Sequence, residues 1–169
     1  MNEPADVTEA GSEHAEAASE TTNASATATP TSPAAAPTPG VTLCDVLIAD
    51  DAGPSRQILS AILRNFAHGL KLAEARNGDE AFDLWQRLQP RITMLDLDMP
   101  GTDGLATLQK IRAASTTAFV AIVSGRSSPD NVRRALELGA SGFVVKPYKP
   151  QRILDLLERY ARVSGQRIG

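Results

Sequence analysis

Several features are scarce in this chain of 169 residues, and each scarcity excludes a class of protein. A single cysteine, Cys44, cannot form an intramolecular disulfide, which favours a reducing, cytoplasmic compartment. The two histidines, His14 and His68, are far apart in the sequence, so a histidine-based metal or catalytic site is not expected. No run of about eighteen apolar residues occurs, so membrane insertion is not expected either.

Basic residues are absent from residues 1–40, which hold five Glu and one Asp and therefore carry a formal charge of −6. Ala, Thr, Pro and Ser dominate this segment, and large apolar side chains are almost missing from it. Burial of so little apolar surface cannot offset the entropy lost on ordering, so we predict a disordered N-terminal tail. The segment lacks the features of a secretory signal or a transit peptide. Residues 41–169 then form one domain.

The charge of this domain argues against a nucleic-acid partner. All seventeen Lys and Arg lie in 41–169 with the remaining fourteen acidic residues, which leaves a formal charge of only +3. Aromatic residues make up 4% of the chain, too few for an obvious base-stacking surface. We therefore expect proteins, and not nucleic acid, as partners.

Four apolar runs each end on a chemically reactive side chain. In chain order, the reactive residues that follow the runs are Asp50 and Asp51, Asp96, Ser124 and Lys146. Runs of this kind are typical of strands that are buried on both faces of a parallel sheet. A further short strand is predicted at 71–75, between the first two runs.

Helical patterns separate the predicted strands. Pro54 marks the first-turn position of one helix, and Asp103 and Ser128 are expected to cap two others. The last helix is predicted at about 150–163, with four residues facing the core: Ile153, Leu156, Leu157 and Tyr160. Five strands that alternate with five helices predict an α/β fold, a doubly wound five-stranded parallel sheet with helices on both faces.

Apolar residues also predict which faces of the first two helices are buried. In the first helix, Ile58, Ile62 and Phe66 form an apolar stripe flanked by Leu59 and Leu63. In the second helix, the residues expected to face inward are Ala81, Leu84, Trp85 and Leu88, and Pro90 is expected to end the helix.

The reactive strand ends should meet in one crevice, because ligands of open α/β sheets bind at the carboxyl ends of the strands. Asp50, Asp51 and Asp96 would offer oxygen ligands that suit Mg²⁺ and would repel one another without a cation. Lys146 can neutralise a phosphoryl group, and Ser124 can donate a hydrogen bond to it. Asp96 is central to this set, so we predict that it is a nucleophile that forms an acyl phosphate.

With these residues in place, residues 44–163 resemble the receiver domain of bacterial two-component response regulators, in particular its stand-alone, CheY-like type. The matching segments are Asp50–Asp51, the Leu95–Gly104 block, Ser124–Gly125, Gly139–Ala140 and Phe143–Pro147. The resemblance implies a flavodoxin-like sheet with strand order 2-1-3-4-5. It also implies a signalling role and no enzymatic turnover of its own.

The resemblance further implies roles for individual residues. Asp96 would be phosphorylated by a histidine kinase or phosphotransferase, and Mg²⁺ would bind Asp50 or Asp51, Asp96 and the backbone carbonyl of Asp98. Ser124 and Lys146 would contact the phosphoryl group, and Phe143 would be the switch aromatic. An unknown protein partner would bind the face made by the fourth helix, the fifth strand and the fifth helix.

Two departures and one local pairing are specific to this sequence. Lys149 stands where the family often has a Thr that caps the last helix, so we expect a weaker cap. No further domain follows the receiver in this sequence, so we expect output through its surface or the tail. Asp98 and Arg126 each lie two residues beyond a site residue, and we expect them to pair across the mouth of the pocket.

Two other functions remain open from the residues alone. Asp96-Leu97-Asp98 satisfies the Asp-x-Asp pattern of haloacid-dehalogenase-like phosphatases, but Pro100 replaces their Thr or Val, and in that family the motif follows the first strand. The other alternative is a binding scaffold of the same fold that is not phosphorylated. The complete set of acidic, hydroxyl and ammonium groups argues against the scaffold.

Overall fold

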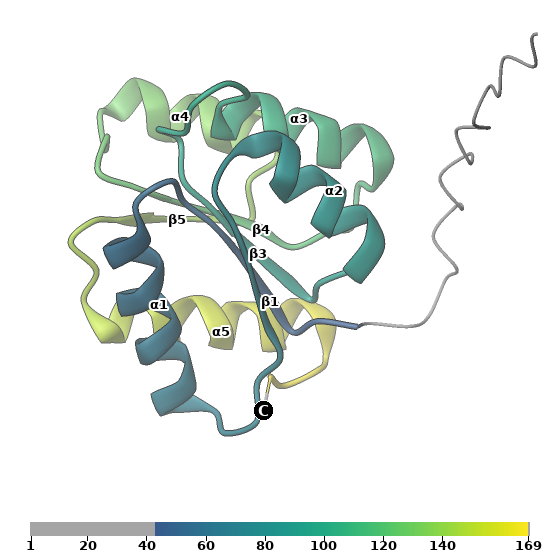
Figure 1. Ribbon diagram of the computed structural model, residues 1–169, viewed down its shortest axis with the longest axis vertical. Coiled ribbons are helices and arrows are strands. Elements are labelled where there is room, and N and C mark those ends of the chain that lie inside the picture. Colours follow the sequence, from purple (N-terminus) through teal and green to yellow (C-terminus); the bar gives the residue numbers. More distant parts are fainter. Residues whose placement is uncertain (1–42, 169) are drawn as a thin grey trace, which may run out of the picture. The chain divides into compact units, whose positions relative to one another are not determined.

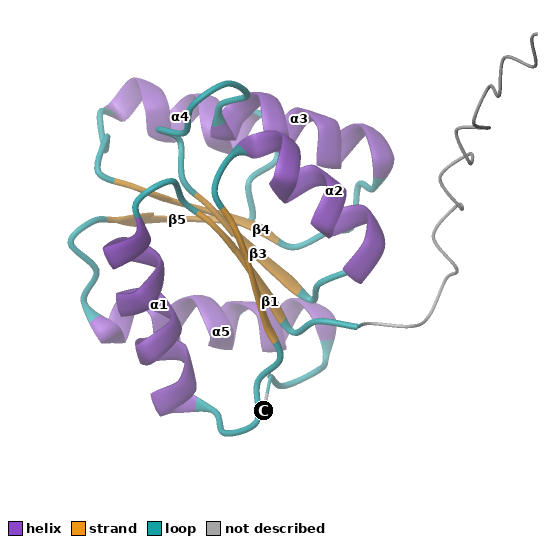
Figure 2. Cartoon of the chain, viewed as in Figure 1, coloured by secondary structure: helices purple, strands orange, loops and turns teal. Residues whose placement is uncertain are grey.

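The computed structural model describes residues 43–168, which form a five-stranded sheet covered by helices on both faces (Figures 1 and 2). The strands are β1 (Val46–Ala49), β2 (Leu72–Ala75), β3 (Ile92–Leu95), β4 (Val120–Ser124) and β5 (Gly142–Val145). All neighbours are parallel and the order is β2-β1-β3-β4-β5, which confirms the predicted doubly wound fold. The tail predicted at 1–40 lies outside the described residues.

Helices cover both faces of the sheet (Figure 1). The helices are α1 (Gly53–Phe66), α2 (Gly78–Leu88), α3 (Gly104–Ala114), α4 (Pro129–Glu137) and α5 (Pro150–Ser164). Alternate residues of each strand point to opposite faces, so Val46 and Ile48 pack towards α1 and α5, whereas Leu47 packs towards α2 and α3. The sheet therefore lies between two hydrophobic layers.

Side-chain caps begin three of the five helices. Asn77, Asp103 and Ser128 each accept a hydrogen bond from a backbone N–H in the first turn of the helix that follows. Lys149 makes no side-chain cap at the start of α5, which confirms the weaker cap predicted there. Helix α5 also buries the four residues predicted for its inner face.

The buried face of α1 differs from the predicted apolar stripe. Leu59 and Leu63 are fully buried, but Ile58 and Phe66 are 53% and 38% exposed. Successive helical residues are rotated by about 100°, so the row that contains Ile58 lies beside the row that faces the sheet. The prediction was therefore wrong for Ile58 and Phe66, because periodicity alone does not decide which of two neighbouring apolar rows meets the core.

A similar correction applies to α2. Ala81 and Trp85 are buried as predicted, and the half-buried Leu84 packs against the same core, whereas Leu88 is half-buried and does not join it. The helix ends at Leu88, and Gln89 adopts a left-handed conformation with φ 46° before Pro90 is reached. The rotation of α2 thus centres the Ala81–Trp85 row on the sheet.

Cys44 lies just before β1 and is buried, with its thiol directed at the carbonyl oxygens of Val46 and Lys71, each 3.2 Å away. Burial raises the pKa of this thiol. No helix among residues 43–168 is both long enough and apolar enough to cross a bilayer.

Candidate functional site

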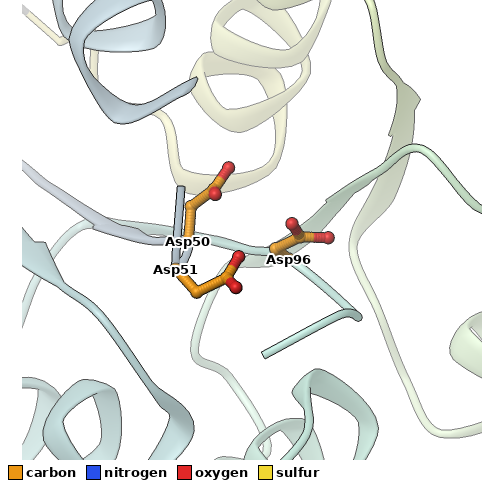
Figure 3. Close-up of side chains that lie close together, drawn as sticks. All are labelled: Asp50, Asp51 and Asp96. Atoms are coloured by element: carbon orange, nitrogen blue, oxygen red, sulfur yellow. The ribbon is translucent and has the colours of Figure 1, made fainter. Parts of the chain in front are cut away.

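Three carboxylates meet where β1 and β3 end (Figure 3). Ala49 and Leu95 are register partners in the β1–β3 pair, so the residues that follow them, Asp50 and Asp96, emerge side by side. The N–H of Asp96 donates to the carbonyl of Ala49 at 2.8 Å, which fixes this alignment. One carboxylate oxygen from each of Asp50, Asp51 and Asp96 lies within 4.8 Å of the others.

The three carboxylates differ in burial and in hydrogen bonding. Asp50 and Asp96 are 3% and 5% exposed, whereas Asp51 faces solvent. Asp50 accepts hydrogen bonds from the N–H of Ala52 at 2.9 Å and from the hydroxyl of Ser55 at 2.6 Å. Asp50 is therefore held in place, while the exposed Asp51 is open to a ligand from solvent.

Lys146, which follows β5, bridges the two buried carboxylates. Its Nζ lies 2.6 Å from Oδ2 of Asp50 and 2.5 Å from Oδ2 of Asp96. The ammonium therefore compensates part of the negative charge that the sequence places at this edge of the sheet.

Burial by itself would lower the pKa of Lys146, but its hydrogen bonds with Asp50 and Asp96 outweigh that effect and raise it. A raised folded-state pKa means that the ion pairs contribute their full stability at neutral pH. That contribution is lost only when the pH rises above the ordinary value of 10.5 and through the folded-state pKa.

Ser124 reaches the same edge but has a different partner. It is the last residue of β4 and fully buried, and its Oγ accepts a hydrogen bond from the N–H of Arg126 at 3.0 Å. Its carbonyl accepts from the N–H of Lys146. The backbone thus joins Ser124 to Lys146, while the hydroxyl is held by the loop after β4.

Asp98 and Arg126 form the ion pair predicted from their positions. Arg126 Nε lies 2.9 Å from Oδ1 of Asp98, and the two side chains are 73% and 42% exposed, respectively. The N–H of Asp98 also donates to Oδ1 of Asp96 at 3.3 Å. The backbone of Asp98 therefore places this exposed ion pair next to Asp96.

Comparison with known proteins tests the resemblance to receiver domains. Residues 46–158 match the model of the response regulator receiver domain, which is more than half of the chain. The chain belongs to the response regulator receiver family. Among its relatives, the chemotaxis protein CheY of Listeria monocytogenes is 36% identical over 117 residues, which are 69% of this chain and 98% of that protein.

Other relatives show that receivers occur in different settings. The probable C4-dicarboxylate response regulator DctR of Priestia megaterium is 34% identical over 68% of this chain, and the chain spans only 50% of that protein. A CheX–CheY–BeF₃–Mg complex from Borrelia burgdorferi matches with a TM-score of 0.64 and 28% identity, covering 72% of this chain and 89% of the matched chain. Receiver homologues are thus signalling proteins, some of them longer than their receiver domain.

The chemistry of this receiver's acidic pocket fits Mg²⁺. All of its candidate ligands are oxygen atoms, which hard divalent cations prefer, and the exposed Asp51 leaves one side open to water. Receiver domains typically bind Mg²⁺ at such a cluster, and Asp50, Asp51 and Asp96 are the residues that would hold it here.

The predicted switch aromatic, Phe143, lies on β5 and is half-buried against the α2–α4 side of the core. On the same side of the receiver, Leu136 of α4 and Val145 of β5 are 49% and 45% exposed. These apolar residues lie on the face predicted for a protein partner.

Three contacts of the pocket were missed from the sequence. Ser55 donates to Asp50, Tyr148 is hydrogen-bonded to Ser55, and the Arg56 guanidinium donates to the backbone carbonyl of Asp50 at 2.7 Å. Ser55 and Arg56 lie in the first turn of α1, next to Asp50–Asp51, and this proximity was the one available signal. Tyr148 is far from them in the sequence, so only the fold reveals its contact.

Proposed function

We propose that this receiver is a phospho-accepting switch and that Asp96 is its phosphorylation site. The observation that carries the proposal is the placement of the buried Asp96 carboxylate between two acidic ligands and the Lys146 ammonium. A carboxylate oxygen of Asp96 would attack the phosphorus of a phosphohistidine on a histidine kinase or phosphotransferase. The new O–P bond forms as the P–N bond breaks, and its electron pair returns to the imidazole nitrogen.

Other residues of the pocket would bind the transferred group. Lys146, already 2.5 Å from Asp96, would neutralise phosphoryl oxygens, and Ser124 would exchange its bond with the Arg126 N–H for one with the phosphoryl group. Asp50, Asp51, Asp96 and the Asp98 carbonyl would hold Mg²⁺, which supplies charge neutralisation for the oxygens of the transferring phosphoryl group.

The switch itself would link Ser124 to Phe143. Movement of Ser124 towards the phosphoryl group would free space that the half-buried Phe143 can fill, and this would change the face that carries Leu136 and Val145. We propose a protein, and not nucleic acid, as the partner of that face. A pull-down with and without beryllofluoride, which mimics the phosphoryl group, would identify it.

Acetyl phosphate with Mg²⁺ should label the protein on Asp96 alone. Asp96→Asn removes the nucleophile, so we expect the phosphoryl mass increase to disappear in intact-protein mass spectrometry. Asp83→Asn, on the exposed surface of α2, should be labelled like the wild type. Labelling of Asp96→Asn at the wild-type level would contradict the assignment, and continuous release of phosphate from phosphate monoesters would favour the phosphatase alternative.

The Asp98–Arg126 ion pair should control the lifetime of the phosphoryl group. The pair lies beside Asp96 and would obstruct the water that attacks the acyl phosphate, so we expect Arg126→Ala to speed dephosphorylation. An exposed pair contributes only about 0–1 kcal/mol, so the melting temperature should change little. The loss of label after removal of acetyl phosphate measures the rate, with Arg134→Ala on α4 as the control. Equal dephosphorylation rates in wild type and Arg126→Ala would contradict a role of the ion pair in the lifetime of the phosphoryl group.

A further inference from the structure

Two hydroxyl groups from distant parts of the chain meet beside Asp50. Ser55 is in the first turn of α1, and Tyr148 lies between Lys146 and the start of α5, 93 residues further along. The two hydroxyls are hydrogen-bonded to each other, and the Tyr148 hydroxyl also lies 3.3 Å from the carbonyl oxygen of Ser55. The proposed phosphotransfer has no role for either residue.

The chemistry of the groups fixes the direction of these hydrogen bonds. An ionised carboxylate can only accept, so the single proton of Ser55 must be donated to Oδ2 of Asp50, 2.6 Å away. Ser55 therefore has no second proton for Tyr148, so the Tyr148 hydroxyl is the donor in their contact and shares its single proton with the Ser55 carbonyl oxygen, 3.3 Å away. The result is a relay in which Tyr148 donates to Ser55 and Ser55 donates to Asp50.

The relay ends on an oxygen that has a second donor. Oδ2 of Asp50 also accepts from Lys146, while Oδ1 accepts from the N–H of Ala52. In the proposed function Lys146 turns to the phosphoryl group, and its bond with Asp50 is then weakened. Ser55 remains, and donation from Tyr148 polarises its hydroxyl and strengthens the bond to Asp50.

We propose that Ser55 and Tyr148 are positioning residues that hold the Asp50 carboxylate in place for Mg²⁺ through this relay. The proposal rests on the magnesium site of the proposed function. Groups that orient metal ligands through hydrogen bonds typically change metal affinity by about 10- to 100-fold when they are removed. Tyr148 acts only through Ser55, so its removal should matter only while the Ser55 hydroxyl is present.

The test is the Mg²⁺ dissociation constant of the unphosphorylated full chain, measured by isothermal titration calorimetry. Ser55→Ala should raise it about tenfold and Tyr148→Phe by a smaller factor, whereas Ser55→Thr keeps the hydroxyl and should restore wild-type affinity. In the double variant, Tyr148→Phe should add nothing to Ser55→Ala. Labelling of Asp96 should recover in each variant at saturating Mg²⁺, because only the metal affinity is changed.

Matched controls remove similar hydroxyls elsewhere. Ser60 lies on the same helix and donates to Glu74, 3.1 Å away, and Tyr160 lies on α5 with its ring against Phe119. Ser60→Ala and Tyr160→Phe should leave the dissociation constant unchanged. If Ser55→Ala fails to fold, the dissociation constants of Tyr148→Phe and Ser55→Thr can still be compared with that of the wild type.

Three results would overturn the relay: unchanged affinity in Ser55→Ala and Tyr148→Phe, an equal effect of Tyr148→Phe with and without the Ser55 hydroxyl, or no Mg²⁺ binding by the wild type. The first two leave Asp96 labelling intact and so count against the relay alone. Altered Mg²⁺ affinity in a protein that is never labelled would support the relay and count against phosphotransfer.

Discussion

Replacement of Lys146 by methionine should lower the free energy of unfolding by about 3–5 kcal/mol when Mg²⁺ is absent. Lys146 is the cation that bridges the buried carboxylates of Asp50 and Asp96, and methionine keeps most of its volume without its charge. The variant would leave both carboxylates buried without this cation. Urea unfolding in the presence of a chelator measures the loss.

Addition of millimolar Mg²⁺ should return part of the lost stability to Lys146→Met, because a bound cation compensates the same carboxylates and binds only the folded state. Lys110→Met is the matched control. Lys110 pairs with Asp79 at 2.7 Å, but both side chains are exposed, so that variant should lose no more than about 1 kcal/mol. Equal free energies of unfolding for Lys146→Met and wild type in chelator would contradict the prediction, because the buried carboxylates would then not depend on the Lys146 charge.

Gly104→Ala should both destabilise the receiver and slow the labelling of Asp96. A Cβ at Gly104 would lie 2.0 Å from the carbonyl oxygen of Asp96 and 2.8 Å from its carbonyl carbon. These are backbone atoms and cannot rotate away, so α3 or the end of β3 must shift. Overpacking of this kind typically costs about 1–3 kcal/mol, and here the shift would also displace the proposed nucleophile.

Gly53→Ala separates this effect from helix propensity. Both glycines are the first residue of a helix, but a Cβ at Gly53 would meet only the Arg56 side chain, at 3.8 Å. Gly53→Ala should therefore be neutral or stabilise by about 0.4–1 kcal/mol. Urea unfolding and the rate of acetyl phosphate labelling give the two readouts. If Gly104→Ala behaves like Gly53→Ala in both, the contact between α3 and Asp96 is not as close as the structure shows.

Local patterns in the sequence were sufficient for the sheet and for the assembly of the acidic cluster. Buried parallel strands have sequences that are continuous apolar runs, and the residues that follow such strands lie together at the carboxyl ends of the sheet. The proximity of Asp50 and Asp96 could therefore be predicted without coordinates. Caps such as Asp103 were also predictable, because their hydrogen bonds reach only three residues along the chain.

Contacts between elements could not be predicted in the same way. The bond between Ser55 and Tyr148 joins α1 to the segment before α5, and it depends on how closely these two elements pack. The exposure of Ile58 depends on the rotation of α1 about its own axis, which neighbouring helices decide. The bridge from Lys146 to Asp50 likewise depends on side-chain directions that strand ends alone do not specify.

The thiol of Cys44 can report local opening of this receiver through its rate of alkylation. It is 3% exposed and lies next to the first strand of the sheet, so an alkylating reagent reaches it only when that part of the structure opens. Because the chain has no other cysteine, the alkylation rate reports one opening event without any engineered label. The same measurement with and without beryllofluoride would show whether phosphoryl binding at the carboxyl ends of the strands changes the stability of the structure at their amino ends.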